Sequence, residues 1–255
     1  MKFWFNKKII NTELELPPKS LRFMNEDDQK FFDIGRVNIK LLEEYGLDKT
    51  SFILDIGSGY GRLAYALNKE FPKFSGKYVG VDILPKHVKW CQDNIEEKLE
   101  NYKFDHLNII NDRYNPEGTI KADQVIIDYN SVEFDLVCLF SVFTHMYERD
   151  IKHYLSQINN NLKKGGLCIA TFFIYDDERL KKINSREDAF NMKYELNSHT
   201  RYYSPEDKLH AISFKKDFVQ KMCVEHNFSM EKIVYGDWAG GQTGYYQDYV
   251  VLRKL

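Results

Sequence analysis

The chain has 255 residues, of which 43% are hydrophobic and 29% are charged, a composition typical of one soluble α/β domain with modest additions. Its formal net charge of −2 gives no electrostatic reason to expect a nucleic-acid partner. No apolar run approaches the roughly 18 residues of a membrane span, and the charged N-terminus does not fit a signal peptide. The cysteines show no paired spacing, as in a reducing compartment. We therefore expect a cytoplasmic protein without a membrane span.

Alternating strand and helix patterns run through most of the chain. Residues 1–30 mix aromatic residues, prolines and charges, and are predicted to form an irregular N-terminal extension. Apolar spacing then predicts, in chain order, helix 28–45, strand 51–56, helix 60–70, strand 77–82, helix 85–101, strand 104–110, strand 134–140, helix 147–162 and strand 167–175. Such alternation predicts a parallel sheet with right-handed crossover connections.

The rest of the chain departs from this alternation. Residues 176–210 are charged and aromatic without clear periodicity, which predicts an insertion after strand five that is either a functional lid or mobile. A helix is predicted near 214–226. An apolar segment at 232–235, a glycine-rich turn at 240–244 and a strand at 248–252 follow it. We interpret these last segments as a hairpin at one edge of the sheet.

The most informative segment is the glycine loop after the first predicted strand, Asp55-Ile-Gly57-Ser-Gly59-Tyr-Gly61. Glycines let a loop turn tightly and let its backbone lie against a ligand. The helix that follows directs its free N–H groups at that ligand. Asp82 ends the second strand, where a carboxylate can accept hydrogen bonds from both hydroxyls of a ribose. Together they predict a site for an adenosine-containing cofactor.

The spacing of the glycines distinguishes between such cofactors. The dinucleotide fingerprint is G-x-G-x-x-G, whereas here the third glycine follows after one residue and position 62 is Arg. The segment closely resembles the D-x-G-x-G-x-G motif of the class I S-adenosylmethionine (SAM) methyltransferases, and the resemblance extends over about residues 30–255. It implies a doubly wound α/β fold with a seven-stranded, mostly parallel sheet and an antiparallel last strand. It also implies SAM, rather than NAD or FAD, as cofactor.

The resemblance implies a set of cofactor-binding residues. Asp55 and the loop backbone would hold the amino acid end of SAM. Asn108 stands where many relatives carry an Asp against the adenine amino group, and its carbonyl oxygen could still accept from that group. The full set is Arg36, Asp55, Gly57, Ser58, Gly59, Gly61, Arg62, Asp82, Ile83, Asn108 and Ser141.

His145, which follows the strand at 134–140, is the candidate general base, because a hydroxyl acceptor loses its proton as it attacks the methyl group. A structural role, in which it only bonds the local backbone, is the alternative. Arginines can bind phosphate or carboxylate, and aromatic side chains can stack on a sugar. The candidate substrate-binding residues are Arg201, Tyr202, Tyr203 and Trp238. No cluster has metal-ligand spacing, so we expect no metal.

The chain lacks the Asn/Asp-Pro-Pro-aromatic sequence of nucleic-acid amino methyltransferases after strand four. We therefore expect methyl transfer to a hydroxyl of a small polar acceptor, a sugar or a phosphorylated metabolite. The lysine-, asparagine- and tyrosine-rich composition resembles bacterial enzymes that modify surface polysaccharides. This resemblance suggests a capsule precursor, either a nucleotide-linked heptose or other sugar, or a phosphoramidate-type group. An N-methyltransferase for an amino sugar or amine, and a non-catalytic SAM-binding protein, are the alternatives.

Overall fold

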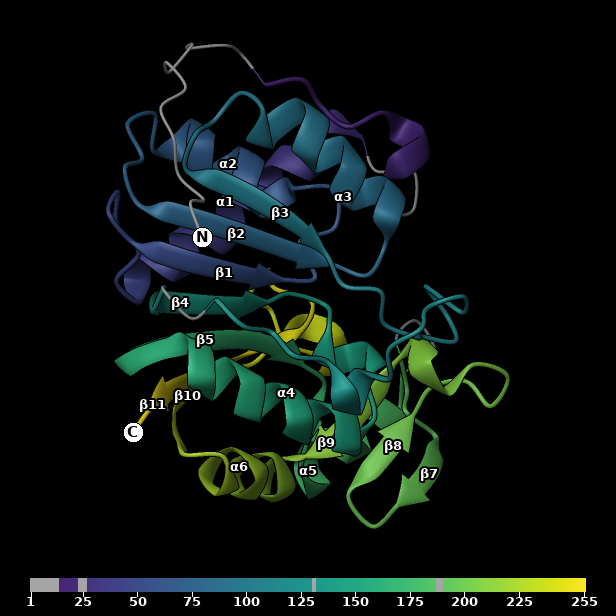
Figure 1. Ribbon diagram of the computed structural model, residues 1–255. Coiled ribbons are helices and arrows are strands. Elements are labelled where there is room, and N and C mark those ends of the chain that lie inside the picture. Colours follow the sequence, from purple (N-terminus) through teal and green to yellow (C-terminus); the bar gives the residue numbers. More distant parts are fainter. Residues whose placement is uncertain (1–13, 23–26, 130–131, 187–189) are drawn as a thin grey trace.

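The computed structural model describes residues 14–22, 27–129, 132–186 and 190–255 (Figure 1). Parts of the predicted N-terminal extension (1–13 and 23–26) and of the predicted insertion (187–189) lie outside these ranges. A short 3-10 helix, η1 (Lys19–Leu21), lies in the described part of the extension, and helix α1 (Asp28–Glu44) begins before the predicted end of the extension. None of the helices in the described ranges has the length and apolar character needed to cross a membrane.

A seven-stranded sheet forms the centre of the molecule. Its strands are β1 (Phe52–Ile56), β2 (Lys77–Asp82), β3 (Tyr102–His106), β4 (Phe134–Leu139), β5 (Leu162–Phe172), β10 (Phe228–Val234) and β11 (Asp248–Lys254). They lie in the order β10-β11-β5-β4-β1-β2-β3. The strands from β5 to β3 pair in parallel, and β11 pairs antiparallel with both β5 and β10. The predicted mostly parallel sheet with a C-terminal antiparallel pair is confirmed, and β10 is its edge strand.

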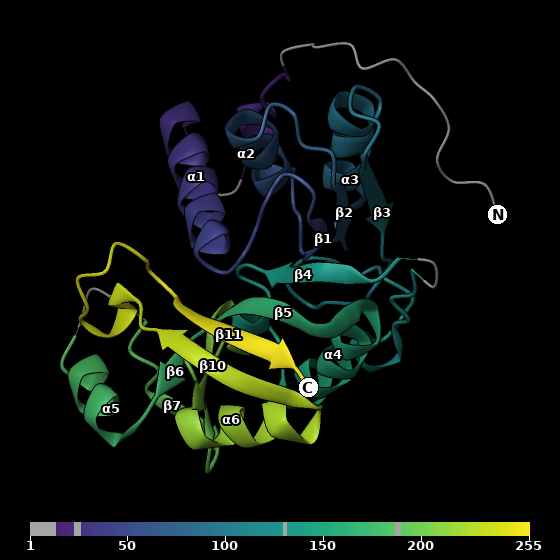
Figure 2. The same cartoon turned by 90° about the vertical axis from the view of Figure 1, so that its left-hand side faces the viewer.

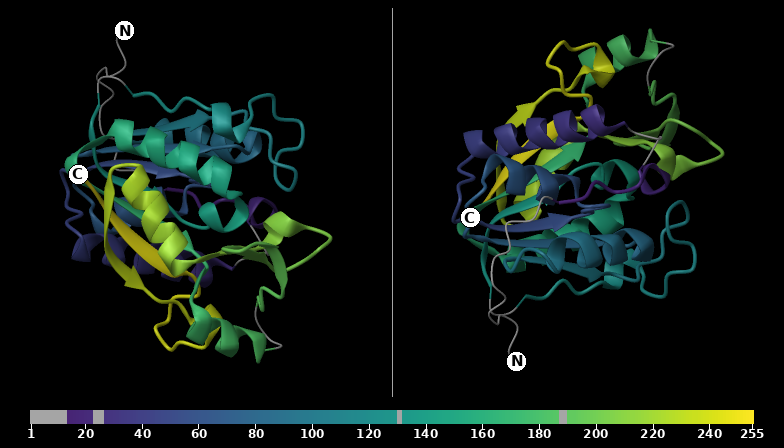
Figure 3. Two further views of the ribbon diagram at one scale, coloured as in Figure 1. Left: turned by 90° about the horizontal axis from the view of Figure 1, so that it is seen from below. Right: turned by 90° about the horizontal axis from the view of Figure 1, so that it is seen from above.

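Helices cover both faces of this sheet (Figure 2). The main ones are α1 (Asp28–Glu44), α2 (Arg62–Glu70) and α3 (Pro85–Cys91) on one face, and α4 (Glu148–Asn161) and α6 (Lys216–Glu225) on the other. Successive strand residues point to opposite faces, so Ile53 packs in the layer under α1 to α3 and Leu54 in the layer under α4 and α6. Views from below and above show the two helix layers separately (Figure 3). The predicted doubly wound fold is confirmed.

Several predicted boundaries shift for identifiable reasons. The third strand begins at Tyr102, because that residue pairs with β2, and the preceding helix changes to a π-helical turn over Gln92–Glu96. Strand five begins at Leu162 rather than 167: Phe134 pairs with Leu162 and Leu136 with Leu167, so the residues between bulge out of register. Helix α6 begins after 215, because residues 212–215 form a strand.

The region predicted as an insertion without periodicity contributes to a second sheet. Its strands are β6 (Ile174–Tyr175), β7 (Tyr194–Asn197), β8 (Thr200–Tyr202) and β9 (Ile212–Lys215), in the order β6-β9-β8-β7. Helix α5 (Asp177–Asn184) lies beside them, and Phe173, Ile183 and Trp238 form part of a separate small core there. Strands of two to four residues are too short to show the alternation of apolar and polar residues. The sequence therefore left this sheet undetected.

Candidate active site

A cavity of about 890 Å³ opens beyond the carboxyl ends of the parallel strands. Open α/β sheets bind ligands at this edge, where the strand order reverses. Loops after β1, β2, β3 and β4 form its walls, together with residues from the segments that flank the strands of the second sheet and from the segment before β11. Two groups of lining residues concern the chemistry: the glycine loop (55–62) with Asp82, and the surroundings of His145.

The glycine loop is held tightly between the ends of β2 and β4. The backbone N–H groups of Gly57 and Ser58 donate to the carbonyl oxygen of Val81 over 2.8 and 3.0 Å. Gly57 has φ +80°, and a Cβ atom there would lie 2.4 Å from Cγ2 of Val142. Only glycine therefore fits at position 57. Gly61 adopts φ +80° at the N-cap of α2, and a Cβ atom at this position would lie 2.7 Å from Cδ1 of Ile95.

Asp82 is bonded directly to this loop. Its Oδ2 atom accepts the backbone N–H of Gly59 over 2.7 Å, and its Oδ1 atom accepts that of Leu84 over 2.8 Å. Burial raises the pKa of Asp82, and these two hydrogen bonds act in the opposite direction. Because each carboxylate oxygen has two lone pairs, both can accept a further donor from the cavity.

Asp55 lies at the base of the same region and lines the cavity. The hydroxyl of Tyr78 donates to its Oδ2 atom over 2.5 Å. Burial raises the pKa of Asp55 to about 7, although the bond from Tyr78 lowers it. The Oγ atom of Ser58 is buried and has no hydrogen-bond partner among the described residues. An unpartnered buried hydroxyl in a cavity wall is a group that a bound ligand can satisfy.

His145 ends the short 3-10 helix Phe143–His145 that follows β4. Its Nδ1 atom lies 2.8 Å from the carbonyl oxygen of Leu209, so Nδ1 must be the donor and Nε2 carries the lone pair. Burial lowers the pKa of His145, and the charges of Arg113 and His210 lower it further. The imidazole is therefore neutral near pH 7 and can accept a proton at Nε2.

Ser141, at the end of β4, is one of the non-glycine residues with positive φ, at 59°. Its backbone N–H donates to Oγ1 of Thr171 over 2.7 Å, and its hydroxyl donates to Oε1 of Gln247 over 3.0 Å. Such a conformation is uncommon for serine and persists only where the surroundings enforce it. These bonds therefore connect the strand-four loop to the segment that precedes β11.

The structure brings most of the sequence-predicted cofactor residues to one cavity. The predicted residues that line it are Asp55, Gly57, Ser58, Gly59, Arg62, Asp82, Ile83, Ser141 and His145. Gly61 is not a lining residue and serves the packing of the loop instead. Arg62 lines the cavity and donates from Nη2 to the hydroxyl of Tyr60 over 2.7 Å.

Besides Gly61, two predicted cofactor residues lie outside the cavity lining. Arg36 is exposed on α1 and pairs with Asp33 over 3.4 Å. Its neighbour Gly35 faces α2, where a Cβ atom would lie 2.9 Å from Cβ of Ala66. One residue further along a helix points about 100° away, which turns Arg36 to solvent. The side chain of Asn108 donates to Oγ1 of Thr119 over 3.1 Å instead of lining the cavity.

None of the four candidate substrate-binding residues is among the described lining residues of the cavity. Arg201 is tied to the carbonyl oxygen of Met192 over 2.8 Å and forms an ion pair with Glu195. Tyr202 belongs to β8, and Tyr203 packs on Phe190 with ring centres 4.9 Å apart. Trp238 is fully buried. These side chains build the second sheet and its core.

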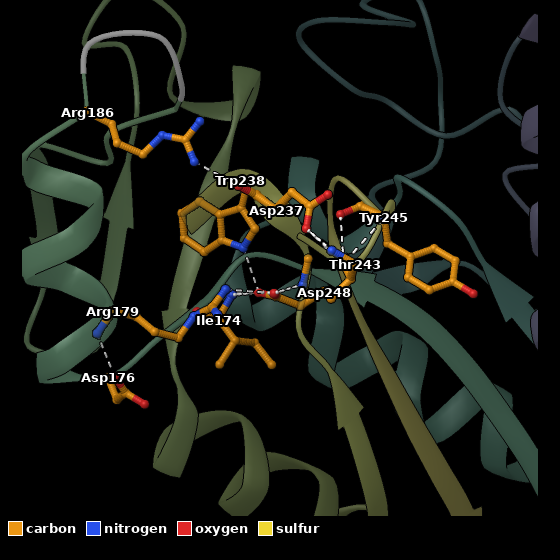
Figure 4. Close-up of polar contacts among 10 residues, drawn as sticks. Ile174, Asp176, Arg179, Arg186, Asp237, Trp238, Thr243, Tyr245 and Asp248 are labelled. Atoms are coloured by element: carbon orange, nitrogen blue, oxygen red, sulfur yellow. Dashed lines mark hydrogen bonds and ion pairs between the residues drawn. The ribbon is translucent and has the colours of Figure 1, made fainter. Parts of the chain in front are cut away.

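A buried carboxylate holds this second unit together (Figure 4). Asp248 accepts hydrogen bonds from the backbone N–H groups of Ile174 and Gly236 over 2.7 and 2.8 Å. It also accepts from Arg179 and from the indole N–H of Trp238, each over 2.8 Å. Burial raises its pKa to about 6, although Arg179 lowers it. Asp248 thus joins β11 to the loop before it, whose Tyr246 and Gln247 line the cavity.

Several lining residues were missed from the sequence. Arg113 and Tyr114 lie in the loop that follows β3, and a loop after a strand end could have indicated them. Phe190, His210 and Tyr246 come from the region without periodicity and from the loop before β11. No sequence signal marks them, because the second sheet alone brings them together. Within the described ranges, no group of three or more His, Cys, Asp or Glu residues could hold a metal ion.

Comparison with known proteins places the chain in a family. A family model described as a methyltransferase domain matches residues 47–227. A protein of Pyrococcus horikoshii has a similar structure, with a TM-score of 0.60, 16% identity, and coverage of 90% of this chain and 93% of that one. A candidate O-methyltransferase from Nostoc punctiforme has a TM-score of 0.56 and 16% identity over 88% of this chain, which spans 56% of that protein.

A third similar structure is the 1,6-didemethyltoxoflavin N1-methyltransferase of Burkholderia thailandensis, solved with its substrate and S-adenosylhomocysteine (SAH) bound. Its TM-score is 0.52 at 14% identity, over 89% of this chain and 79% of that one. At these identities the structures show a shared fold. The family model covers more than half of the chain and includes the glycine loop, Asp82 and His145. The chain therefore belongs to the methyltransferase domain family, with the fold of the class I SAM-dependent enzymes.

Proposed function

We propose that this SAM-dependent methyltransferase moves the methyl group to a hydroxyl of a small polar acceptor. The favoured acceptor class is a bacterial capsular polysaccharide precursor, such as a nucleotide-linked heptose or another sugar. The proposal of methyl transfer is supported by one observation: the glycine loop, Asp82 and His145 all line the walls of one cavity. A cofactor site and a neutral base thus share a single enclosed space.

The cavity residues fit SAM. Asp82 has lone pairs available for the two ribose hydroxyls, and the glycine loop is close enough to bond the same carboxylate. Asp55 offers a carboxylate for the ammonium of the amino acid end, and the unpartnered Ser58 hydroxyl offers a further polar contact. When bound, SAM supplies the electrophilic methyl carbon.

His145 is proposed as the base that receives the acceptor proton at Nε2. The bond from Nδ1 to Leu209 fixes the ring orientation and the tautomer. Proton transfer to a positioned base contributes about 10²–10⁴-fold to a rate. The cavity walls would add to this by aligning the acceptor oxygen with the methyl group, since orientation alone supplies several kcal/mol.

A second candidate is N-methylation of an amino sugar or another amine. The carboxylates of Asp112 and Asp150 also line the cavity, and negative groups favour a cationic acceptor. An amine that binds in its neutral form needs no strong base, so the two candidates differ in their dependence on His145.

The cofactor half of the proposal is tested by calorimetric titration with SAM and SAH. Asp82→Asn removes the charge that accepts the ribose hydroxyls and should weaken binding at least about tenfold, since a hydrogen bond to a charged group contributes about 1.5–3 kcal/mol. Asp93→Asn, which removes an exposed carboxylate from the turn after α3, is the matched control. Wild-type protein that binds neither SAM nor SAH would contradict the proposed function.

The transfer half is tested by SAH formation with a panel of nucleotide-linked sugars and amino sugars. With a hydroxyl acceptor, His145→Ala should lower kcat about 10²–10⁴-fold while SAM binding stays intact. His226→Ala is the matched control, because that ring also bonds a backbone carbonyl oxygen, 2.7 Å away, but lies at the end of α6. A loss of only a few-fold for His145→Ala would refute the base assignment and favour the amine acceptor.

A further inference from the structure

We infer that the acceptor binds as a ring with an apolar face, packed on an aromatic wall beside His145, in surroundings that select against phosphoryl groups. This inference rests on the proposed function and names the acceptor class of the same site. Of the acceptors considered above, it favours a sugar ring that bears no phosphoryl group beside His145, with any nucleotide diphosphate held away from the wall, and it disfavours the phosphoramidate-type group. The four side chains of the wall, all of which line the cavity, are Phe173, Phe190, His210 and Tyr246.

The wall is a continuous set of packed rings. Phe190 is central: its ring centre lies 5.6 Å from that of Phe173, 5.4 Å from that of His210 and 6.0 Å from that of Tyr246. The interplanar angles are 70–79°, so the rings pack edge to face. Phe190 is half-buried and Tyr246 is 48% exposed, so part of the aromatic surface stays open to a ligand. Aromatic faces of this kind pack against sugar or aromatic rings.

The wall is held in place from behind. Phe173 packs edge-on against Trp238 with ring centres 4.9 Å apart, and Trp238 is anchored by Asp248 (Figure 4). Arg186 donates to the carbonyl oxygen of Asp237 over 2.8 Å and so secures the loop that carries Tyr246. A ligand that binds to an already ordered surface loses less affinity to the ordering of side chains.

The wall and the base are positioned by one short segment. The 3-10 helix η6 (Lys208–His210) supplies the Leu209 carbonyl oxygen that orients His145, and its next residue is the wall residue His210. On the other side, the ring of Tyr114 lies edge-on to His145 at 5.6 Å. The segment that orients His145 thus also carries a wall residue, so the inferred acceptor site lies between the wall and the imidazole, with a hydroxyl substituent directed at Nε2.

The charges around His145 oppose a phosphoryl group. Among the described lining residues, Arg62 and Arg113 carry the positive side chains, and Arg62 belongs to the glycine-loop region. Arg113 forms an ion pair with Asp207, which weakens its attraction for a further anion. Asp112 and Asp150 add negative charge to the lining. A phosphoryl dianion beside His145 would thus meet the carboxylate of Asp112, that of Asp150, which lies 4.0 Å from Arg149, and an arginine that is already paired. Repulsion by the carboxylates is unfavourable in a partly desolvated site.

The test measures ring binding to the protein saturated with SAH. Two matched pairs of probes are titrated: methyl glucoside against glucose 6-phosphate, and phenol against phenyl phosphate. In at least one pair, the uncharged ring should bind about tenfold more tightly than its phosphorylated counterpart. The pair that shows binding distinguishes a sugar acceptor from an aromatic one. A phosphorylated probe that binds more tightly, or no binding by either uncharged ring, would overturn the inference.

Variants test the wall itself. Phe190→Ala should lower the affinity for the uncharged ring probe about tenfold. Phe190→Leu keeps most of the apolar volume and should lower this affinity less. Tyr194→Ala is the matched control, because this 42% exposed aromatic residue belongs to the second sheet but not to the described cavity lining. Asp112→Asn should raise the affinity for the phosphorylated probe several-fold, because it removes a negative charge from the cavity lining. Unchanged ring binding in both Phe190 variants would overturn the inference.

SAH affinity, measured first in every variant, separates the two proposals. If the wild-type protein does not bind SAH, the proposed function is contradicted. Intact SAH binding without discrimination between the probes contradicts only the acceptor class.

Discussion

Replacing Asp55 by Asn should stabilise the folded protein at and above neutral pH while it weakens cofactor binding. The Asp55 carboxyl group is buried at the base of the cavity, and the burial raises its pKa from 3.8 to about 7. Ionising Asp55 in the folded protein therefore costs free energy, because the buried carboxylate has lost its hydration. Asn has a similar shape, stays neutral, and can still accept the Tyr78 hydroxyl through its carbonyl oxygen.

The magnitude follows from the size of the pKa shift. A rise from 3.8 to about 7 corresponds to about 4 kcal/mol, at about 1.4 kcal/mol per pKa unit. Because the folded-state pKa is the higher one, the contribution to stability is full below pH 3.8 and is lost as the pH rises through about 7. The stability difference between Asp55→Asn and the wild type should therefore grow by about 2–3 kcal/mol between about pH 5 and about pH 8.

Urea unfolding of both proteins at the two pH values measures this difference, with Asp93→Asn as the control for the loss of an exposed carboxylate. Calorimetric titration with SAH measures the expected loss of binding in the same samples. A stability difference that does not change with pH would refute the reasoning, because it would mean that folding does not alter the Asp55 pKa. Wild-type SAH affinity in Asp55→Asn would refute its contact with the amino acid end of the cofactor.

Further predictions concern the loop, the base and the second sheet. Gly57→Ala should lower the free energy of unfolding in urea by about 1–3 kcal/mol and weaken SAH binding, because residue 57 has φ +80° and its new Cβ atom would lie 2.4 Å from Val142. Adding Val142→Ala should restore only the stability lost to the steric clash. Full recovery of stability in the double variant would exclude backbone strain. Because the pKa of His145 is lowered, the acid limb of kcat/KM should lie below pH 6.5, and a limb above that value would contradict the proposed base. Trp238→Phe removes a donor to buried Asp248 and should cost about 1–3 kcal/mol, whereas unchanged urea unfolding would show that the remaining donors suffice.

The features that the sequence predicted are those with a local physical cause. The alternation of apolar strands and amphipathic helices determined the doubly wound sheet, because each element must bury one face or both. The glycines at 57, 59 and 61 satisfy a backbone requirement that other residues meet poorly. Asp82 stands at a strand end, and the carboxyl ends of parallel strands meet at one edge of the sheet. The position of the glycine loop and Asp82 at one edge of the sheet could therefore be predicted without a structure.

The acceptor region depends on contacts between residues that are far apart in the chain. His145 is oriented by Leu209, 64 residues away, and the aromatic wall unites Phe173, Phe190 and Tyr246, which come from three separate segments outside the strands. The family resemblance implied a cofactor-binding role for Arg36, whereas the rotation of the helix directs this side chain to solvent. Backbone conformation and strand burial are determined by neighbouring residues, whereas side chains from separate loops meet only after the sheets have packed. For this reason the sequence by itself determined the fold and the place of the glycine loop and Asp82 at the sheet edge, and only the tertiary structure decided which side chains line the rest of the cavity.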